Sequence, residues 1–404
     1  MRQFTPTRIA ALGFCFAISG AALAQSRPSC SDPPAQPITI VDVPGNPFQA
    51  LPTSDGCWVF VSLPSTTLAF PSGVGLMKRF GGRLTLERVV PVPGGATGMA
   101  LTHDDKTLIV AADRRVAFID ARAFIAGRRN PVLGYLDEPG VMGRVYANVS
   151  RDDAYAFIAD ERSQTISVID LAKARTTQFK PSAVIGKIPT GASPIALTFS
   201  TDGALMFATS QRAPEALHWP IACRRENGPP TDTTPVFPQG AIHVIDVTKT
   251  KTDAANAVIH SVPAGCNPVR LVLSPNGDRA YVSARNSNAL LVFDTRKLRD
   301  DPTNALLGRV PLGTGPVGVA VIDSGRKIVV TNSNRFAGDS TDRQTLNVVD
   351  ASKISAGAEA VVGVIPAGAF PREMRVTSDG RVLLLTNFGS RSVQMVDLTR
   401  LPIQ

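Results

Sequence analysis

The sequence has few aromatic residues: Phe, Trp and Tyr make up 6% of its 404 residues. So few rings argue against a platform on which the bases of single-stranded nucleic acid would stack. The formal net charge is +9, but no run of five or six Lys or Arg residues occurs. The positive charge is therefore dispersed, and nucleic acid is not an expected partner.

Motifs for metal, haem and nucleotide chemistry are also missing. The sequence contains neither C-x-x-C nor C-x-x-C-H. The segment Gly313–Gly318 matches the letters of a dinucleotide fingerprint, but it opens a predicted strand rather than a helix. We therefore predict no metal, no cofactor and no complete catalytic set. No pair with metal-ligand spacing occurs among the histidines, which are His103, His218, His243 and His260.

Long apolar runs are absent except near the N-terminus, where the pattern is that of a secretory signal. Arg2 and Arg8 precede or flank an apolar stretch, Ile9–Ile18, and small residues follow at Ala22–Ala24. The apolar stretch is too short to span a bilayer, although an uncleaved anchor is the alternative. We expect a signal over residues 1–24 that is cut after Ala24. Export to the periplasm or beyond the cell would follow, with one domain over residues 25–404.

One pattern recurs along this domain. A loop containing glycine and proline is followed, nine residues after the proline, by a second glycine in an Asp-Gly, Asn-Gly or Ser-Gly turn. Constant spacing of this kind is the signature of a repeat architecture. Weaker copies begin at Thr97 and Arg144. The clear copies begin at Pro47, Pro194, Pro268, Pro316 and Pro371.

Each copy contains four segments with strand character. In one copy, Val269–Leu273 precedes the turn, Ala280–Ser283 follows it, and a third segment ends at Asp294. A fourth leads to the next loop. Asn-Gly and Asp-Gly suit the reversal because they tolerate positive φ. Seven such copies at intervals near 50 residues predict an all-β, seven-bladed β-propeller of four-stranded antiparallel blades. One longer interval contains an insertion at residues 211–239.

The ends of the chain predict how the ring closes. The last copy stops after Val396–Asp397 without a fourth strand, whereas Pro37–Val43 has strand character but no repeat of its own. We expect this N-terminal segment to complete the last blade. Closure of this kind removes two exposed sheet edges, which would otherwise invite aggregation.

The pattern across Gly265–Asp294, Gly-x-x-Pro…Ser-Pro-Asn-Gly…Ala-Tyr-Val-Ser…Val-Phe-Asp, resembles the YVTN-type (YncE-like) β-propeller repeat of exported bacterial proteins. The second and third copies depart from it because they lack the Asp-Gly turn. The resemblance implies an exported propeller. Similar propellers include surface-layer and periplasmic proteins of unassigned role, lactonases and relatives of quinoprotein dehydrogenases.

Four cysteines lie after the predicted signal, and an even number in an exported chain predicts two disulfides. In a four-stranded blade, the loops before the first strand and after the second lie on one face, which we call the loop face. Cys223 in the insertion and Cys266 in the next loop share this face, so we expect them to pair. Elimination then pairs Cys30 with Cys57. Four free thiols are the alternative.

Polar residues interrupt the innermost strands two positions after the proline column. That column reads Gln49, Met99, Tyr146, Ala196, Arg270, Gly318 and Glu373. Its polar members, with Arg144 and Arg372 beside them, could line the channel mouth on the loop face; alternatively they are spacers hydrated by channel water. A second set follows the second strands and could form a polar ring for a carboxylate or sugar, or serve only as turn residues. This set contains Asp160, Arg162, Arg285, Asn332, Arg335 and Asn387.

These observations predict a monomeric, non-catalytic binding or scaffold propeller. Its expected ligand is a protein, a peptide or a cell-envelope polymer, bound on the loop face where the long loops gather. The alternative is a lactonase-like hydrolase at the channel mouth, which requires Arg270 and Glu373 to converge with a third polar group. A redox subunit related to quinoprotein dehydrogenases is a third hypothesis.

Overall fold

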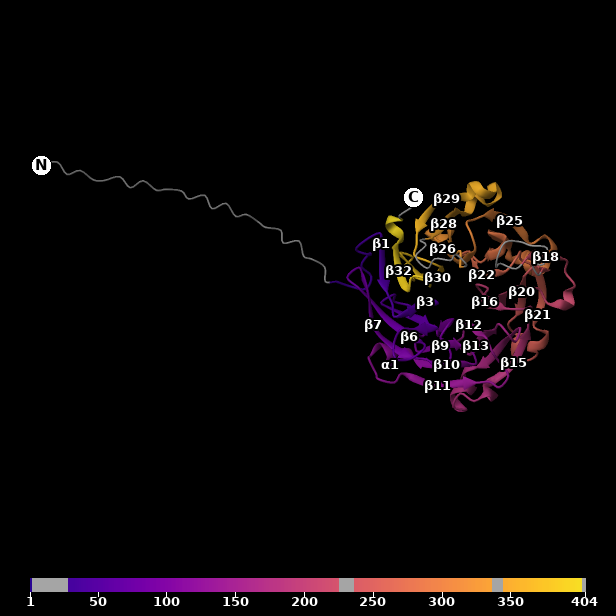
Figure 1. Cartoon of the computed structure of the whole chain (residues 1–404), viewed down its shortest axis with the longest axis horizontal. Helices are drawn as coiled ribbons and strands as arrows, with labels where there is room; N and C mark the ends of the chain where they lie inside the picture. Colours follow the sequence, from indigo (N-terminus) through magenta and orange to yellow (C-terminus); the bar gives the residue numbers. More distant parts are fainter. Residues whose placement is uncertain (2–27, 225–235, 336–343, 402–404) are drawn as a thin grey trace.

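Seven four-stranded antiparallel sheets form a ring in the computed structural model, which describes residues 1, 28–224, 236–335 and 344–401 (Figure 1). We number the sheets as blades 1 to 7. Blades 1 to 3 are β3 (Gln49–Pro52), β4 (Trp58–Leu63), β6 (Gly73–Phe80) and β7 (Arg83–Pro91); β8 (Met99–Leu101), β9 (Thr107–Ala112), β10 (Arg115–Asp120) and β11 (Val132–Asp137); and β12 (Arg144–Val149), β13 (Tyr155–Asp160), β14 (Thr165–Asp170) and β15 (Val184–Pro189).

The second half of the ring repeats this arrangement and ends with a strand from the N-terminus. Blades 4 to 7 are β16 (Pro194–Phe199), β17 (Leu205–Ser210), β20 (Ala241–Asp246) and β21 (Val258–Pro263); β22 (Pro268–Leu273), β23 (Arg279–Ala284), β24 (Ala289–Asp294) and β25 (Leu306–Pro311); β26 (Pro316–Ile322), β27 (Lys327–Asn332), β28 (Thr345–Asp350) and β29 (Val361–Pro366); and β30 (Pro371–Val376), β31 (Val382–Asn387), β32 (Ser392–Asp397) and β1 (Ile38–Asp42). The predicted fold class, including the closing strand, is confirmed.

The turn between the first and second strands explains both the motif and its exceptions. The reversing residue has positive φ, which glycine adopts without strain, as at Gly277. In blades 2 and 3 this position is taken by Asp105 (φ 54°) and Asp153 (φ 52°). Their carboxylates accept the backbone N–H groups of Ser54 and His103 from the preceding blade, at 3.0 and 2.8 Å. At these two positions the aspartate both forms the turn and joins neighbouring blades.

The same geometry corrects the alignment of the second copy by one residue. Its reversing residue is Asp105 rather than Lys106. The channel-facing position equivalent to Tyr146 is consequently Gly98 and not Met99. The Gly98 carbonyl accepts the N–H of Ala111 at 2.9 Å, which fixes this register.

The aspartates that end the third strands cap short helices. Asp120, Asp170 and Asp294 accept backbone N–H groups in the first turns of α1 (Ala121–Ile125), α2 (Leu171–Thr176) and α3 (Thr295–Asp300), respectively. Aspartate is favoured at such N-cap positions because its carboxylate binds N–H groups that have no partner within the helix. These helices and the first-to-second strand turns share the face opposite the loop face, which we call the turn face.

Hydroxyl groups on the second strands hold neighbouring blades together near the channel. Thr209 donates to the Val269 carbonyl at 3.2 Å, which joins blade 4 to blade 5. Thr386 of blade 7 donates to the Phe48 carbonyl beside blade 1, also at 3.2 Å, and so acts across the closure. Apolar packing crosses the same boundary, where Val59 and Val61 pack in one buried cluster with Leu384. The last and first blades therefore join through side chains as well as through β1.

Two disulfides join the pairs of cysteines that were expected from the sequence, Cys30 with Cys57 and Cys223 with Cys266. Two disulfides indicate an oxidising, extracellular compartment. The part of the predicted signal at residues 2–24 lies outside the described residues. Within the part of the chain that the structure describes, no helix is both long and apolar enough to cross a membrane.

Closure by β1 makes a prediction that can be tested with proline. Hydrogen bonds join Asp397 N–H to the Pro37 carbonyl and Val43 N–H to the Arg391 carbonyl, each at 2.9 Å. Because antiparallel bonding alternates along a strand, the N–H of Val41 faces β32 and that of Ile40 faces outward. Val41→Pro should lower the free energy of unfolding by about 2 kcal/mol, since it leaves a ladder acceptor without its donor.

Ile40→Pro is the matched control, and we expect a clearly smaller loss because a proline is tolerated where an edge N–H faces solvent. Chemical denaturation of both variants measures the difference. Equal losses would show that β1 does not pair with β32 in this register.

Candidate functional site

Three of the predicted channel residues meet in the interior of the ring. The guanidinium of Arg270 forms an ion pair with Glu373, and it lies over the Tyr146 ring at 4.9 Å from the ring centre. The Tyr146 hydroxyl donates to Glu373 at 3.3 Å. Arg270 and Glu373 are only 3% and 1% exposed. Blades 3, 5 and 7 thus each contribute one side chain to a buried ionic cluster.

Arg375 completes this cluster, and it was missed from the sequence. Its guanidinium donates to Glu373 at 2.6 Å and to the Tyr146 hydroxyl at 2.5 Å. Arg375 lies two residues after Glu373 on β30, so both side chains point to the same side of the strand. The alternation of side chains along a strand, in which residues i and i+2 share a side, was therefore the signal that could have identified Arg375.

Arg372 lies on the loop side of the cluster, where three aromatic rings surround it. Its guanidinium is 3.9 Å from the ring centre of Phe48 and 5.5 and 5.6 Å from those of Phe370 and Phe388. Burial, together with the positive charge of nearby Arg270, lowers the pKa of Arg372 to about 9. The cation therefore stays charged at neutral pH.

Several donors in this region lack hydrogen bonds. Nη1 and Nη2 of Arg270, Nε2 of Gln49 and Nε of Arg372 are buried and have no hydrogen-bond partner among the described residues. The other end of the Gln49 amide does have a partner, because its Oε1 accepts the N–H of Met99. Buried donors without acceptors are costly, so this part of the channel has unmet capacity to bind an acceptor.

The second predicted set does not come together as a ring. Asp160 is buried in blade 3, where it contacts Arg144 Nε at 3.3 Å and accepts a bond from Ser167. Burial raises the pKa of Asp160 to about 6, although Arg144 lowers it. Arg144 is shared with Glu138 of the loop after blade 2, at 2.6 Å. The group therefore joins blade 3 to the loop after blade 2.

The remaining members of this set are held locally or exposed. Asn387 accepts the N–H of Gly368, in the loop before blade 7, at 3.1 Å, and it donates to Gln394 within blade 7 at 3.2 Å. Asn332 donates to Thr345 at 3.0 Å within blade 6. Arg285 donates to Gln211 of the insertion at 3.2 Å. Exposed side chains complete the set, namely Arg162 and Arg335. For Asn387 and Asn332, local hydrogen bonding is the observed role.

The cavity next to the ionic cluster opens on the turn face. It has a volume of about 300 Å³, and its lining includes Leu101, Val149 and Leu273, which end their strands just before the turns, and His103 within a turn. We expected the polar column at the loop-face mouth. The column instead lies partway along strands that run from the loop face to the turn face, so its side chains are buried within the channel.

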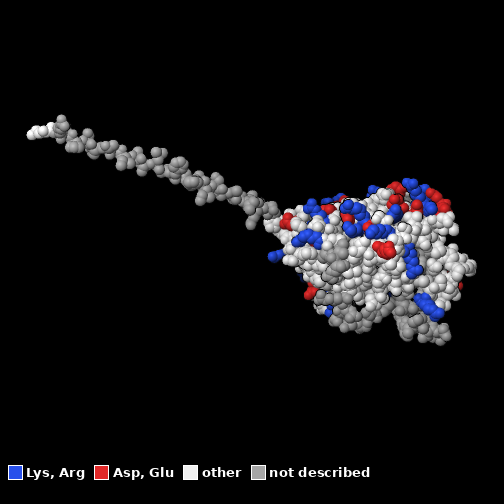
Figure 2. Space-filling view, turned by 90° about the horizontal axis from the view of Figure 1, so that it is seen from above, with Lys and Arg blue, Asp and Glu red and all other residues white. Residues whose placement is uncertain are grey.

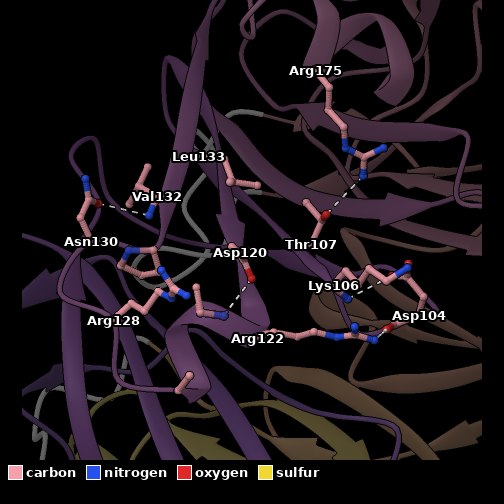
Figure 3. Close-up of a pocket in the computed structure, with 13 residues that line it drawn as sticks. Asp104, Lys106, Thr107, Asp120, Arg122, Arg128, Asn130, Val132, Leu133 and Arg175 are labelled. Atoms are coloured by element: carbon pink, nitrogen blue, oxygen red, sulfur yellow. Dashed lines mark hydrogen bonds and ion pairs between the residues drawn. The ribbon is translucent and has the colours of Figure 1, made fainter.

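A larger hollow of about 890 Å³ lies on the turn face beside α1 (Figure 3). Several of its charged groups already have partners: Lys106 pairs with Asp104 at 2.8 Å, and Arg175 donates to Thr107 at 3.3 Å. Arg122 likewise donates to the Asp104 carbonyl. Charged side chains of both signs gather along one side of the ring (Figure 2). The smaller channel cavity is therefore chemically more distinctive than this hollow, because it adjoins donors with unmet bonds.

The cluster is better suited to hold charge than to transfer a proton. Burial alone would raise the pKa of Glu373, but the combined charges of Arg270 and Arg375 hold it below its ordinary value. A carboxylate that stays ionised and doubly paired is a weak general base. Burial also raises the pKa of the Tyr146 phenol, which stays protonated at neutral pH.

Glu373→Gln should destabilise the protein by about 3–5 kcal/mol at neutral pH, because it leaves buried guanidinium groups without their counter-charge. In the wild-type protein the lowered pKa of Glu373 stabilises the fold above its ordinary value of 4.5, and this contribution is lost as the pH falls through the lower folded-state pKa. The difference between variant and wild type should therefore shrink in acid.

Denaturant unfolding at several pH values, with the exposed Glu359→Gln as the control, measures this difference. A gap that stays constant between neutral and strongly acidic pH would contradict the ionised state assigned to Glu373.

Comparison with known proteins supports the fold and goes no further. The chain matches no protein-family model, and no curated protein is similar to it in sequence. Hydrazine synthase from Kuenenia stuttgartiensis has a similar structure, with a TM-score of 0.65 and 16% identity over 88% of this chain and 97% of that chain. The Cps50 (Swd1) β-propeller domain from Myceliophteria thermophila is also similar in structure, with a TM-score of 0.62 and 11% identity over 89% of this chain and 99% of that chain. At such identities the likeness concerns the propeller fold alone.

Proposed function

We propose that this protein is an exported, non-catalytic binding propeller that recognises a protein or peptide on its loop face. The observation that carries the proposal is an apolar hairpin in the long insertion. Its strands, β18 (Ile221–Arg224) and β19 (Val236–Pro238), pair antiparallel. Ile221 is 64% exposed and Val236 is 47% exposed, and Leu217, at the end of the short helix that precedes β18, is also exposed. We call these three side chains the hairpin surface.

Covalent and polar contacts hold the hairpin in place. The disulfide from Cys223 to Cys266 attaches β18 to the loop before blade 5. Asn286 donates to the Arg224 carbonyl at 3.2 Å, and Ala213 N–H donates to the Gln239 carbonyl at 2.9 Å at the base of the insertion. A surface fixed before binding loses little conformational entropy when a partner docks.

Apolar side chains on such a support favour contact with a protein or peptide over contact with a polysaccharide, because exposed apolar groups gain by leaving water. The two disulfides fit a partner outside the cytoplasm. The chemistry of the ionic cluster supports binding over hydrolysis, since Glu373 is held ionised between Arg270 and Arg375.

Site-specific photo-crosslinking tests the proposal. A photoreactive residue at Ile221 should yield a distinct protein adduct in an extracytoplasmic extract of the producing organism. The matched control is the same residue at Leu306, which is 54% exposed on the outer strand of blade 5. The adduct at 221 should disappear when Leu217 and Val236 are both changed to Asp, and folding of that variant is checked by its circular dichroism.

Equal adducts at 221 and 306, or an adduct that survives the double substitution, would count against recognition at the hairpin surface. An adduct that contains only carbohydrate would replace the protein partner with an envelope polymer.

A further inference from the structure

The turn-side cavity of the channel combines a cationic floor with a wall of aliphatic side chains, among which His103, Asn148 and Thr198 are also found. Apolar side chains from blades 1 to 6 contribute to the wall. The Tyr146 ring and the guanidinium groups of Arg270 and Arg375 lie at the floor. A volume of about 300 Å³ is at the lower end of the range for small-molecule sites. The wall residues include Leu51, Met99, Leu101, Val149, Leu197 and Leu273.

The floor, together with Arg372 on the loop side of the cluster, carries more positive than negative charge. Glu373 is the acidic group within the cluster, and it forms ion pairs with both Arg270 and Arg375. Arg372 lies close enough to Arg270 for the charge of Arg270 to lower the pKa of Arg372. Three guanidinium groups therefore share one described carboxylate. Uncompensated buried charge is costly, and one further anion would reduce the imbalance.

Unmet hydrogen bonds point to the same chemistry. The Nε of Arg270 donates to Glu373, but the Nη1 and Nη2 groups of Arg270 have no acceptor in the described part of the chain. A guanidinium presents paired N–H groups whose geometry matches a carboxylate. The orphan donors and the charge imbalance are independent observations, and both call for an oxyanion.

We propose that the turn-side end of the channel binds a small organic carboxylate, with its oxyanion at Arg375 and Arg270 and its apolar body against the wall. The Arg375 side chain is 28% exposed, so it is the cation that an entering ligand meets first. Inorganic phosphate would satisfy the floor but leave the apolar wall in water, so an organic acid uses the whole cavity. This site lies on the face opposite the hairpin surface and stands independently of the function proposed above.

Calorimetric titration with 4-phenylbutyrate tests the proposal, with 4-phenylbutanamide as the uncharged analogue and inorganic phosphate as the oxyanion without an apolar body. The carboxylate should bind saturably, and both comparison compounds should bind about tenfold or more weakly, which is the scale of one charge-assisted hydrogen bond. Equal binding of the amide would overturn the oxyanion site, equal binding of phosphate would overturn the assignment of an organic acid, and the absence of saturable carboxylate binding would overturn both.

Substitution of Arg375 locates the site. Arg375→Met should weaken 4-phenylbutyrate binding about tenfold or more. Arg381→Met, at an exposed turn-face position in the same blade, should leave it unchanged. Similar losses in both variants would show that general surface charge attracts the ligand.

A measurement on the unaltered protein keeps the test decisive if Arg375→Met does not fold. Phenylglyoxal modifies accessible arginines, and peptide mass spectrometry then reports the extent at each position. 4-Phenylbutyrate should protect Arg375 and not Arg381, whereas the amide should protect neither. Modification of Arg375 that is unaffected by the carboxylate would contradict the proposal.

Discussion

Pairing of an N-terminal strand with the C-terminal strand is the constraint on which the rest of the structure depends. Blade 7 has three strands from the end of the chain, and β1 supplies its fourth through the register Ile38–Val396 to Asp42–Ser392. Without β1, the outer edge of β32 would lie open, and an open edge invites pairing with other chains. The hydrogen bond from Thr386 to the Phe48 carbonyl and the apolar contacts between blades 7 and 1 complete the closure.

Closure also positions the candidate site, because the ionic cluster takes its side chains from blades that are far apart in sequence. Tyr146 and Glu373 are 227 residues apart, yet the ring places them within hydrogen-bonding distance. Arg270 joins them from a third blade. A closed ring fixes the positions of these strands relative to one another. The buried charged side chains are therefore already in place, and they lose little conformational entropy when a ligand binds. The hairpin surface relies on the same frame through the Cys223–Cys266 disulfide.

Much of the fold could be predicted from the sequence because each blade repeats the same pattern of strands and turns. The spacing from Pro268 to Gly277 encodes one strand and one turn, and its recurrence encodes the number of blades. The closing strand could be predicted because the last copy lacks a fourth strand and the N-terminal segment has strand character but no repeat of its own. The channel chemistry was only partly predictable: Arg270, Glu373 and Tyr146 fell in one column, but their depth depends on how seven strands tilt around an axis. Arg375 was missed because it lies outside the aligned column that contains Glu373, two residues further along the same strand. Asp105 was misaligned because an aspartate stands where most of the other turns have glycine, and its carboxylate bonds to the preceding blade.

Hydrogen exchange of the backbone amides in β1 and β32 tests the closure most directly. If β1 is the fourth strand of blade 7, the N–H groups of Thr39, Val41, Val393 and Met395 exchange as slowly as those in the outer pairs of strands of the other blades. The outward-facing N–H of Ile40 exchanges faster. Rapid exchange at all of the β1 positions, with β32 exchanging like a free edge strand, would contradict a ring closed by the N-terminal strand.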